Sequence, residues 1–594
     1  MEPVNKIIGV LKTRDYVHFI IILPDGKISA EFEGSKLANK CLPGDIVYWN
    51  GDKCILVNRA NHPPIVGTIE LKSKTKYGVS ARGHFKYLFV PYSEEYPYMI
   101  VGCSEKDVSC NRIGVVTIAE WHDNRQFPNA DLIRTLGISG EPAAEKDAVL
   151  WQYCPYRYTS KFLKNTASSD IDPPLSVRQH IGDGLTINID PIGCRDIDDV
   201  ITFIHIRDTL WKIIITISDV ACQIEDGCII DKMARHIGQT FYLNGIAKCP
   251  MLPPTISEES CSLLPGQPRT GVSLEFLWNG QEGIEEKITD KKWYCSSFTN
   301  NRSYSYEEFQ ISHELPERCI LQQISTFLER SEELIEDSHK WVEACMKLYN
   351  TEAGCLLRAY SHGILRMHAE PDREKLQKYV AIEPSLAVFA YSSAVYCPVD
   401  NTGTTDTRHF GIGVSTYCHA TSPIRRYSDL INQRIIKKII DGCEDITTTT
   451  TMTIPDIVQT VERLNSRSKA IKSYDRDILF IQSALDKGLA ERRLNGIIID
   501  IIEKTSKDGR KMYKIKIFIK AWNKCISCLY NRGDDLGEII SNDETMRLLI
   551  VEAQHVQIYY AINMNGRRWK QRIVFTLFDE EMNNTDDGLM QNLV

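Results

Sequence analysis

The sequence predicts a multidomain α+β protein, with small β-barrels toward both ends and a large mixed α/β block between them. Three observations predict this class. The chain has 594 residues, which is enough for roughly three to five domains of about 100–200 residues each. Short apolar strands separated by Pro/Gly turns dominate residues 1–155 and again 488–580, and the longest helical patterns lie within 156–487.

The first 155 residues predict two consecutive β-barrels. In the first, expected over 1–62, Phe19–Leu23 enters a Pro-Asp-Gly turn and the alternating strand Lys27–Phe32 follows. A second β unit, expected over 63–155, ends in a helical stretch. Two small barrels in series indicate OB-type modules, which often bind single nucleic-acid strands but also serve other roles.

The central block, 156–487, is the part of the chain large enough to bury a deep core and enclose a site. Residues 488–580 return to short strands, and one of these alternates so that Lys514 and Lys516 share the face opposite to its apolar side chains. The acidic residues 581–594 predict a disordered tail. Four helical patterns are expected in the central block, at 320–349, 373–379, 429–440 and 457–493.

Composition excludes several protein classes. The 70 basic and 78 acidic residues give a formal charge of -8, which excludes a globally basic nucleic-acid binder but not local basic surfaces. The 19 cysteines are scattered and too sparse for a disulfide scaffold, so we expect free thiols in a reducing, cytoplasmic setting. No secretory signal and no apolar run of about 18 residues is found, and we expect no membrane contact.

Four carboxylates lie within ten residues. An apolar strand ends at Asp190, and Asp196, Asp198 and Asp199 follow a Pro/Gly turn. Apolar flanks predict partial burial, where such charges repel one another and need a cation. Hard divalent ions take oxygen ligands, and Mg²⁺ is the expected one. The alternative is an acidic turn neutralised by Arg195 and similar residues.

A second motif, Thr-Ser-Pro-Ile-Arg-Arg-Tyr, carries two adjacent arginines, Arg425 and Arg426. Pro423 stands near the start of a helical pattern, as is typical of a helix N-terminus. Such an end favours phosphate, and paired guanidinium groups strengthen that preference. The alternative is that the arginines pair with Asp429 and nearby acids.

Aromatic and basic residues elsewhere suggest contacts with a nucleic acid. Tyr242 precedes the loop Pro250–Pro254 and is expected either to stack on a base or to belong to the core. Arg568 and Trp569 lie in a basic cluster that offers backbone charge and a stacking ring. The alternative for this cluster, and for the lysine face near residue 515, is a solvated charged surface.

These motifs, in this order, resemble the ribonuclease II/ribonuclease R (RNB) exoribonucleases, a family that includes the catalytic subunit of the eukaryotic RNA exosome. Residues 127–150 are most similar to the second cold-shock domain of the eukaryotic-type members. Two positions depart from the family pattern, Ala420 in place of Phe and Thr216 where eukaryotic members often have His. The motifs that carry the resemblance are Asp190-x5-Asp196-x-Asp198-Asp199, Ile217–Val220, Tyr242-Leu243 before Pro250–Pro253, Glu343 and Asn350 before Leu365–His368, and Thr421–Tyr427.

The resemblance implies two cold-shock OB domains, 1–62 and 63–155, an RNB catalytic domain, 156–487, and an S1-type OB domain, 488–580. It implies processive hydrolysis of single-stranded RNA from its 3′ end, releasing nucleoside 5′-monophosphates with Mg²⁺, or Mn²⁺ in its place. We expect a monomer, without the N-terminal PIN nuclease domain that docks the exosome subunit, and hence without an exosome tether.

The resemblance also implies a role for each site residue. The four aspartates would hold one or two metal ions, with Asp198 and Asp199 the most sensitive to loss. Arg425 would stabilise the charge that grows on the phosphate. Tyr242 would clamp the 3′-terminal base, Arg426 would position the backbone and Glu343 would read the ribose. Lys514, Lys516, Arg568 and Trp569 would guide the strand.

Two rival functions stay open. Some RNB relatives have lost their aspartates and act as RNA-binding regulators, so a catalytically inactive RNA-binding protein is the main alternative. Here the four aspartates and Arg425 are all present, which favours catalysis. The second rival is a metal-dependent DNA nuclease, which Glu343 and the RNA-type flanking domains disfavour.

Overall fold

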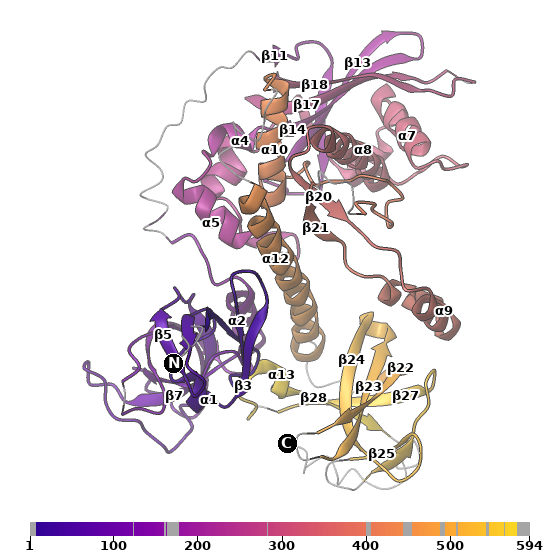
Figure 1. Cartoon of the computed structure of the whole chain (residues 1–594). Coiled ribbons are helices and arrows are strands. Elements are labelled where there is room, and N and C mark those ends of the chain that lie inside the picture. The colour runs from indigo at the N-terminus through magenta and orange to yellow at the C-terminus, as the bar shows by residue number, and fades with distance from the viewer. Residues whose placement is uncertain are drawn as a thin grey trace, which may run out of the picture. The chain divides into compact units, whose positions relative to one another are not determined.

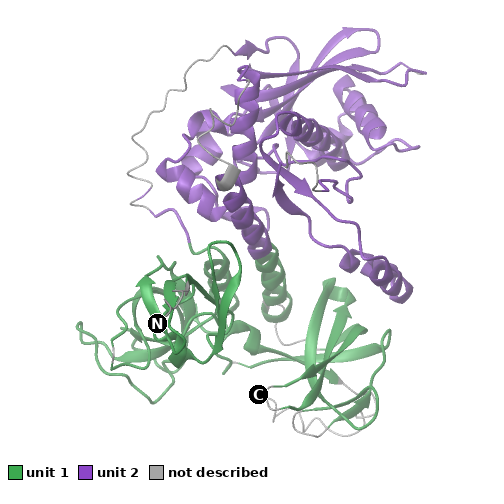
Figure 2. Cartoon of the chain, viewed as in Figure 1, with its two compact units in different colours: residues 1–155, 472–594 green, residues 156–471 purple. Residues whose placement is uncertain are grey.

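A computed structural model of the chain describes every residue except 1–6, 123, 160–161, 163–177, 282, 400–405, 444–453, 487–492, 507–508, 542–545, 564 and 579–594. The predicted acidic tail, 581–594, lies outside the described residues. Two compact units are formed, residues 1–155 together with 472–594, and residues 156–471 (Figure 2). None of the described helices is both long and apolar enough to cross a membrane. All 19 cysteines fall in the described ranges and are free thiols.

The N-terminal sheet of the first unit has five strands in the order β3-β2-β1-β4-β5 (Figure 1). Its core contains Phe19 and Ile21, which alternate along one strand with more exposed neighbours. The predicted Pro-Asp-Gly turn closes with Gly26 at φ 83°, a conformation that glycine adopts without strain. The elements are β1 (Ile7–Thr13), β2 (His18–Ile22), β3 (Ile28–Glu33), α1 (Ser35–Ala38), β4 (Ile46–Trp49) and β5 (Cys54–Asn58).

The next sheet is a closed barrel with the strand order β10-β8-β7-β6-β9. Helix α2 carries the fully buried Glu145, which forms an ion pair at 2.5 Å with Arg572 from the C-terminal end of the same unit. The buried hydroxyls of Tyr92 and Thr68 complete this cluster. The elements are β6 (Ile65–Ile69), β7 (Lys86–Pro91), β8 (Met99–Gly102), β9 (Arg112–Ile118), β10 (Asn129–Ile138) and α2 (Pro142–Tyr153).

The C-terminal sheet has the order β26-β25-β24-β23-β22-β27-β28. The predicted alternation is confirmed on β23, where Tyr513, Ile515 and Ile517 are buried and Lys514 is exposed. The elements are β22 (Arg493–Thr505), β23 (Lys511–Ile519), η4 (Lys520–Trp522), β24 (Lys524–Arg532), β25 (Glu538–Ile540), β26 (Arg547–Leu549), β27 (His555–Ile562), α13 (Trp569–Arg572) and β28 (Ile573–Phe578).

The second unit is built on a seven-stranded sheet in the order β11-β18-β17-β14-β13-β12-β19. Its central strands are buried for most of their length, as expected for a sheet that is covered on both faces. The strands are β11 (Gln179–His180), β12 (Leu185–Asp190), β13 (Asp199–Arg207), β14 (Leu210–Ser218), β17 (Pro268–Asn279), β18 (Ile288–Thr299) and β19 (Arg302–Ser305), with the small pairs β15 (Phe241–Leu243) and β16 (Ile246–Cys249), and β20 (Ile364–Met367) and β21 (Val395–Pro398).

The second unit also contains helices, of which α10 packs against β18 and α6 against β12. The single helix predicted over 320–349 is wrong, because α7 ends at Leu328 and α8 begins at Ser338. Between them the chain turns with Arg330 at φ 52°, and Asp337 caps the second helix. The helices of this unit are α4 (Val220–Gln223), α5 (Ile229–Ile237), η1 (Thr255–Ser260), α6 (Tyr306–Ile311), α7 (Pro316–Leu328), α8 (Ser338–Ala359), α9 (Arg373–Ile382), η2 (Pro384–Ala390) and α10 (Tyr427–Ile440). Helix α12 (Ile454–Ile481) begins in this unit and ends in the other, where η3 (Gln482–Asp486) follows it.

Candidate active site

Two neighbouring strands and the turn between them bring the aspartates together at one end of the large sheet. β12 ends at Asp190, and β13 begins at Asp199 and runs back beside it. The connecting turn has Gly193 at φ 81° and presents Asp196. Asp198, directly before β13, is 4% exposed. The sequence alone predicted a turn flanked by buried strands, and the antiparallel pairing converts that turn into a cluster of carboxylates.

The carboxylates raise one another's pKa. Burial raises the pKa of Asp199 well above its usual range, and the charges of Asp190 and Asp198 raise it further. Burial also raises the pKa of Asp190, with a contribution from Asp196. The pKa of Asp198 rises to about 7, chiefly through burial, although Arg425 opposes the shift. The cluster is therefore short of positive charge.

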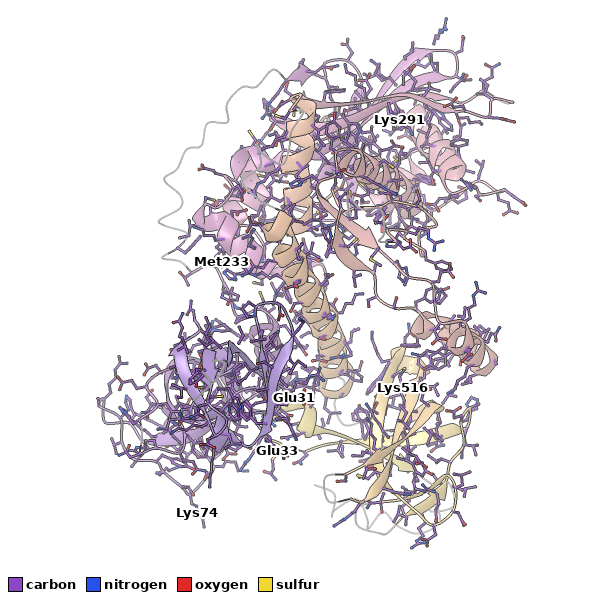
Figure 3. The ribbon with its side chains drawn as sticks, in the orientation of Figure 1. Glu31, Glu33, Lys74, Met233, Lys291 and Lys516 are labelled. Atoms are coloured by element: carbon purple, nitrogen blue, oxygen red, sulfur yellow. The ribbon has the colours of Figure 1, made fainter. Side chains whose placement is uncertain are left out.

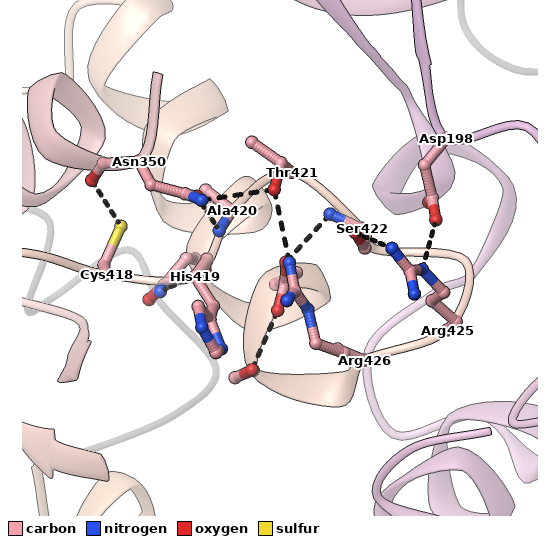
Figure 4. Close-up of polar contacts among 12 residues, drawn as sticks. Asp198, Asn350, Cys418, His419, Ala420, Thr421, Ser422, Arg425 and Arg426 are labelled. Carbon is pink, nitrogen blue, oxygen red and sulfur yellow. Dashed lines mark hydrogen bonds and ion pairs between the residues drawn. The ribbon is translucent and has the colours of Figure 1, made fainter. Parts of the chain in front are cut away.

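The arginine-bearing loop, residues 419–426, supplies one positive group to this cluster (Figure 4). Arg425 Nε donates to Asp198 Oδ2 at 3.2 Å, and the backbone N–H of Ile424 donates to the other oxygen of this carboxylate at 2.9 Å. The guanidinium also donates to Ser422 Oγ at 3.1 Å. Because the Arg425 side chain is 44% exposed, part of its guanidinium faces solvent and is open to a ligand.

Two buried residues hold the loop. Asp429, on the first turn of α10, accepts from the backbone N–H of Ser422 at 2.8 Å and from Arg426 at 2.7 Å. Asn350, on α8, accepts from Ala420 N at 2.8 Å and donates to Thr421 Oγ1 at 3.2 Å (Figure 4). Asn350 belongs to a motif of the family resemblance, but its role was not predicted, because its partners lie about 70 residues further along the chain.

The two arginines of the motif therefore make different contacts. Arg426 pairs with Asp429 and also donates to Thr421 Oγ1 at 3.2 Å, which confirms the alternative of an internal ion pair for this residue. Arg425 instead faces the carboxylates. The backbone role on RNA that the resemblance implies for Arg426 stays a prediction, since its donors are engaged inside the loop.

Two tyrosines border the cluster. The Tyr242 hydroxyl, from β15, donates to Asp196 Oδ2, and the ring is half-buried, which does not fit the alternative of a core residue. Tyr306, the first residue of α6, lies close enough to Asp190 and Asp199 for their charges to raise its pKa, after the larger effect of burial. Sequence reasoning missed Tyr306 because it follows the aspartates by more than a hundred residues and belongs to no motif.

Comparison with known proteins identifies the second unit. Residues 178–336 and 319–442 match the family model described as the RNB domain, and residues 86–154 match the Dis3-like cold-shock domain 2. The chain carries an RNB domain. The predicted fold class is confirmed, with cold-shock and RNB modules in the expected order.

Individual relatives are distant. The chain is 24% identical over 489 residues to ribonuclease R of Buchnera aphidicola subsp. Schizaphis graminum, an alignment covering 67% of this chain and 65% of that protein. The chain thus spans slightly less than two thirds of the length of this curated relative. Its fold is similar to Mycoplasma genitalium RNase R in complex with ribose methylated single-stranded RNA, at TM-score 0.71 and 19% identity, covering 96% of this chain and 100% of that one. It is also similar to yeast Ssd1, a pseudonuclease, at TM-score 0.60 and 15% identity, covering 94% and 82%.

The remaining predicted residues of the RNB domain and its flanks lie in other surroundings. Glu343 forms ion pairs on α8 with Lys340 at 2.6 Å and Lys347 at 3.0 Å. Hydrogen bonds and coulombic effects from these lysines, which outweigh burial, lower the pKa of its carboxyl. None of its contacts within the described part of the chain is to the carboxylate cluster, so its ribose-reading role stays a prediction.

The four C-terminal residues predicted to bind RNA differ in how accessible their side chains are. Lys514 is exposed on β23, whereas Lys516 lies 3.7 Å from Asp500 and is labelled in Figure 3. Arg568 donates to the Pro91 carbonyl at 2.9 Å and to Glu94 at 2.8 Å. Trp569 is 6% exposed. A buried ring presents no open face to a base, so the stacking expected of Trp569 does not fit the structure. The contacts of Arg568 with Pro91 and Glu94 attach it to the closed barrel.

The donor chemistry of the cluster fits a hard divalent ion, although the arrangement is not a closed metal site. Within the described ranges, no three His, Cys, Asp or Glu side chains are placed so that they could hold a metal ion. Asp198 is engaged by Arg425 and Asp196 by Tyr242, whereas Asp199 accepts no hydrogen bond from the described residues. The uncompensated charge at Asp190 and Asp199 is the observation that suits a cation.

Proposed function

We propose that the chain is a hydrolytic 3′→5′ exoribonuclease that degrades single-stranded RNA processively to nucleoside 5′-monophosphates. The observation that carries the proposal is the convergence of four aspartates and Arg425 at one end of the RNB sheet. The similarity to ribonuclease R supports RNA as the substrate. We further propose that the protein acts as a cytoplasmic monomer.

In this proposal Asp190, Asp196, Asp198 and Asp199 would hold Mg²⁺, or Mn²⁺ in its place, which would supply activation of water and charge neutralisation at the phosphate. Arg425 contributes the open part of its guanidinium to a phosphate oxygen, in a position fixed by Asp198 and Ser422. A fixed donor at the place where charge grows is worth more than one that must reorganise during the reaction.

Tyr242 and the two residues that hold the arginine-bearing loop, Asp429 and Asn350, have supporting roles. The half-buried ring of Tyr242 stands beside Asp196, where it limits the space next to the scissile phosphate and offers a face to the 3′-terminal base. Asp429 and Asn350 hold the loop that carries Arg425, so the guanidinium is in place before RNA binds. Among the described contacts, neither Asp429 nor Asn350 touches the carboxylate cluster.

A catalytically inactive RNA-binding protein is the second candidate. The fold similarity to the pseudonuclease Ssd1 favours it, as does the absence, among the described side chains, of three ligands already placed for a metal ion. Purified chain incubated with 5′-labelled single-stranded RNA and Mg²⁺ separates the two candidates. Progressive shortening supports the exoribonuclease, whereas RNA that is bound but not shortened supports the inactive binder.

A further inference from the structure

A cavity of about 300 Å³ is lined by residues of α4 and α10 in the RNB unit. None of its lining residues belongs to the carboxylate cluster or to the loop that carries Arg425. Its volume is at the lower end of the range typical of small-molecule sites. The apolar part of its lining comes from both helices and the residue after α4, namely Ala221, Ile224, Ile431 and Ile435.

A buried histidine with an unsatisfied ring nitrogen lines this cavity. His362, in the turn between α8 and β20, is 3% exposed, and its Nε2 has no hydrogen-bond partner among the described residues. Burial, and next the charge of Lys438, lower its pKa, so the ring is neutral. A buried polar atom without a partner is costly, and a polar group on a bound molecule would remove that cost.

The basic side chains of the lining are largely engaged. Arg434 forms an ion pair at 2.9 Å with Asp231 and donates to the Ile224 carbonyl at 3.0 Å. Lys437 donates to both oxygens of Asp219 at 2.7 Å. Asp231 and Asp219 do not line the cavity, and Asp219 also pairs with Arg178 at 3.1 Å. An anionic ligand would therefore find little free positive charge here.

Two of the three acidic side chains of the lining are in the opposite situation, whereas the third, Asp226, forms an ion pair with Arg434 at 3.4 Å. Glu225 and Asp441 are exposed, and neither has an ion-pair partner in the described part of the chain. Asp441 is also the C-terminal cap residue of α10, where the aligned peptide dipoles place partial negative charge. Against these groups stands the ammonium of Lys438, so the open side of the cavity has an excess of negative charge.

We propose that this cavity binds a small organic monocation with an apolar body, of the class of aromatic alkylamines. The apolar body would lie against Ile431 and Ile435. The ammonium, with its three N–H donors, would face Glu225, Asp441 and the unpartnered Nε2 of His362. The ligand would rest on α10, which begins two residues after Arg425 and is joined to the region of α4 by Gln433, whose side chain donates to the Ser218 carbonyl at 2.7 Å.

The first test measures charge selectivity on the full chain without RNA. Isothermal titration calorimetry would compare phenethylamine, neutral 2-phenylethanol and anionic phenylacetate, with adenosine monophosphate as an unrelated anion. We expect one saturable site for phenethylamine, with affinity at least tenfold higher than for 2-phenylethanol. Equal affinities, no binding of the amine, or tighter binding of phenylacetate or the nucleotide would overturn the proposal.

The second test places the site. The double variant Glu225→Gln/Asp441→Asn should weaken phenethylamine binding at least fivefold and leave 2-phenylethanol unchanged, because it removes charge without changing shape. The matched control Glu332→Gln/Glu333→Gln, at two exposed acids of the same unit, should leave both affinities unchanged. Ala221→Met should fill the cavity and weaken both ligands, and if that variant does not fold, the charge pair still decides. Unchanged amine binding in Glu225→Gln/Asp441→Asn would contradict the site.

Discussion

Arg425 Nε lies 3.2 Å from Asp198 Oδ2, although 227 positions separate the two residues in the sequence. This contact joins the two motifs that the proposed cleavage needs, a carboxylate cluster on the large sheet and a guanidinium on a separate loop. It leaves the Arg425 side chain 44% exposed. The pair therefore orients the arginine while part of its guanidinium stays open to a phosphate.

Replacing Arg425 by lysine should lower kcat for single-stranded RNA by roughly 10²–10³-fold, the usual cost of losing one preorganised donor to the developing charge. Lysine keeps the charge but cannot contact Asp198 and a phosphate in the same fork geometry. Single-turnover cleavage rates measure this loss. Arg408→Lys, at a 64% exposed arginine of the same unit, is the matched control and should retain the full rate. Equal rates for the two variants would show that Arg425 does not act on the reaction.

Asn350→Ala should lower kcat about tenfold with little change in KM, since the Ala420 N–H and the Thr421 hydroxyl lose a partner and the arginine loop loosens. The loss corresponds to ~1.4 kcal/mol, within the ~1–3 kcal/mol that an unsatisfied buried group costs. Steady-state kinetics separates kcat from KM. Asn279→Ala, at the end of β17, should leave both constants unchanged. A rise in KM with unchanged kcat would instead make Asn350 a substrate-binding residue.

Tyr242→Ala should raise KM more than Tyr242→Phe does, because phenylalanine keeps the ring and loses only the hydroxyl that contacts Asp196. Base stacking on one aromatic ring contributes ~1–3 kcal/mol, which corresponds to roughly 5–150-fold in KM. Titration with RNAs of fixed length measures this change. Identical KM values for the two variants would remove the stacking role.

Glu145→Gln should destabilise the unit that contains the closed barrel, because it leaves the guanidinium of Arg572 buried without its counter-charge. Breaking such a buried pair costs about 3–5 kcal/mol, and thermal unfolding of the full chain would detect the loss. Glu308→Gln, which breaks the exposed pair between Arg302 and Glu308, is the control and should cost less than about 1 kcal/mol. Similar shifts in Tm for the two variants would mean that the buried pair does not join the barrel to α13.

Local patterns predicted the parts of the fold that depend on neighbouring residues. The alternation in β23 and the spacing of the four aspartates both follow from one short stretch of sequence, and the structure confirms the strand and brings the carboxylates together. The helical pattern over 320–349 led to the wrong prediction of a single helix. The apolar spacing persists across the turn near Arg330, and nothing local predicts a left-handed residue there.

The features that were not predicted depend on contacts between residues far apart in the sequence. The basic cluster around Arg568 and Trp569 had the composition of an RNA-binding surface, yet Trp569 is buried and Arg568 contacts the second barrel. A single sequence does not indicate which domain covers such a cluster. Tyr306 approaches the carboxylates, and Asn350 the arginine loop, only because the sheet and α8 fold back on them. Tyr306 belongs to no motif, and the motif that contains Asn350 does not indicate which loop this residue contacts.

The central claim is that the clustered aspartates of this RNB domain support metal-dependent cleavage of RNA. The most direct measurement follows a 5′-labelled single-stranded RNA on a denaturing gel, with wild-type protein and Asp199→Asn, each with Mg²⁺ and with EDTA. We expect stepwise shortening from the 3′ end by the wild type with Mg²⁺ only, and no shortening by Asp199→Asn although its RNA affinity is unchanged. RNA that is bound by the wild type but keeps its full length, or cleavage by Asp199→Asn at the wild-type rate, would contradict the claim.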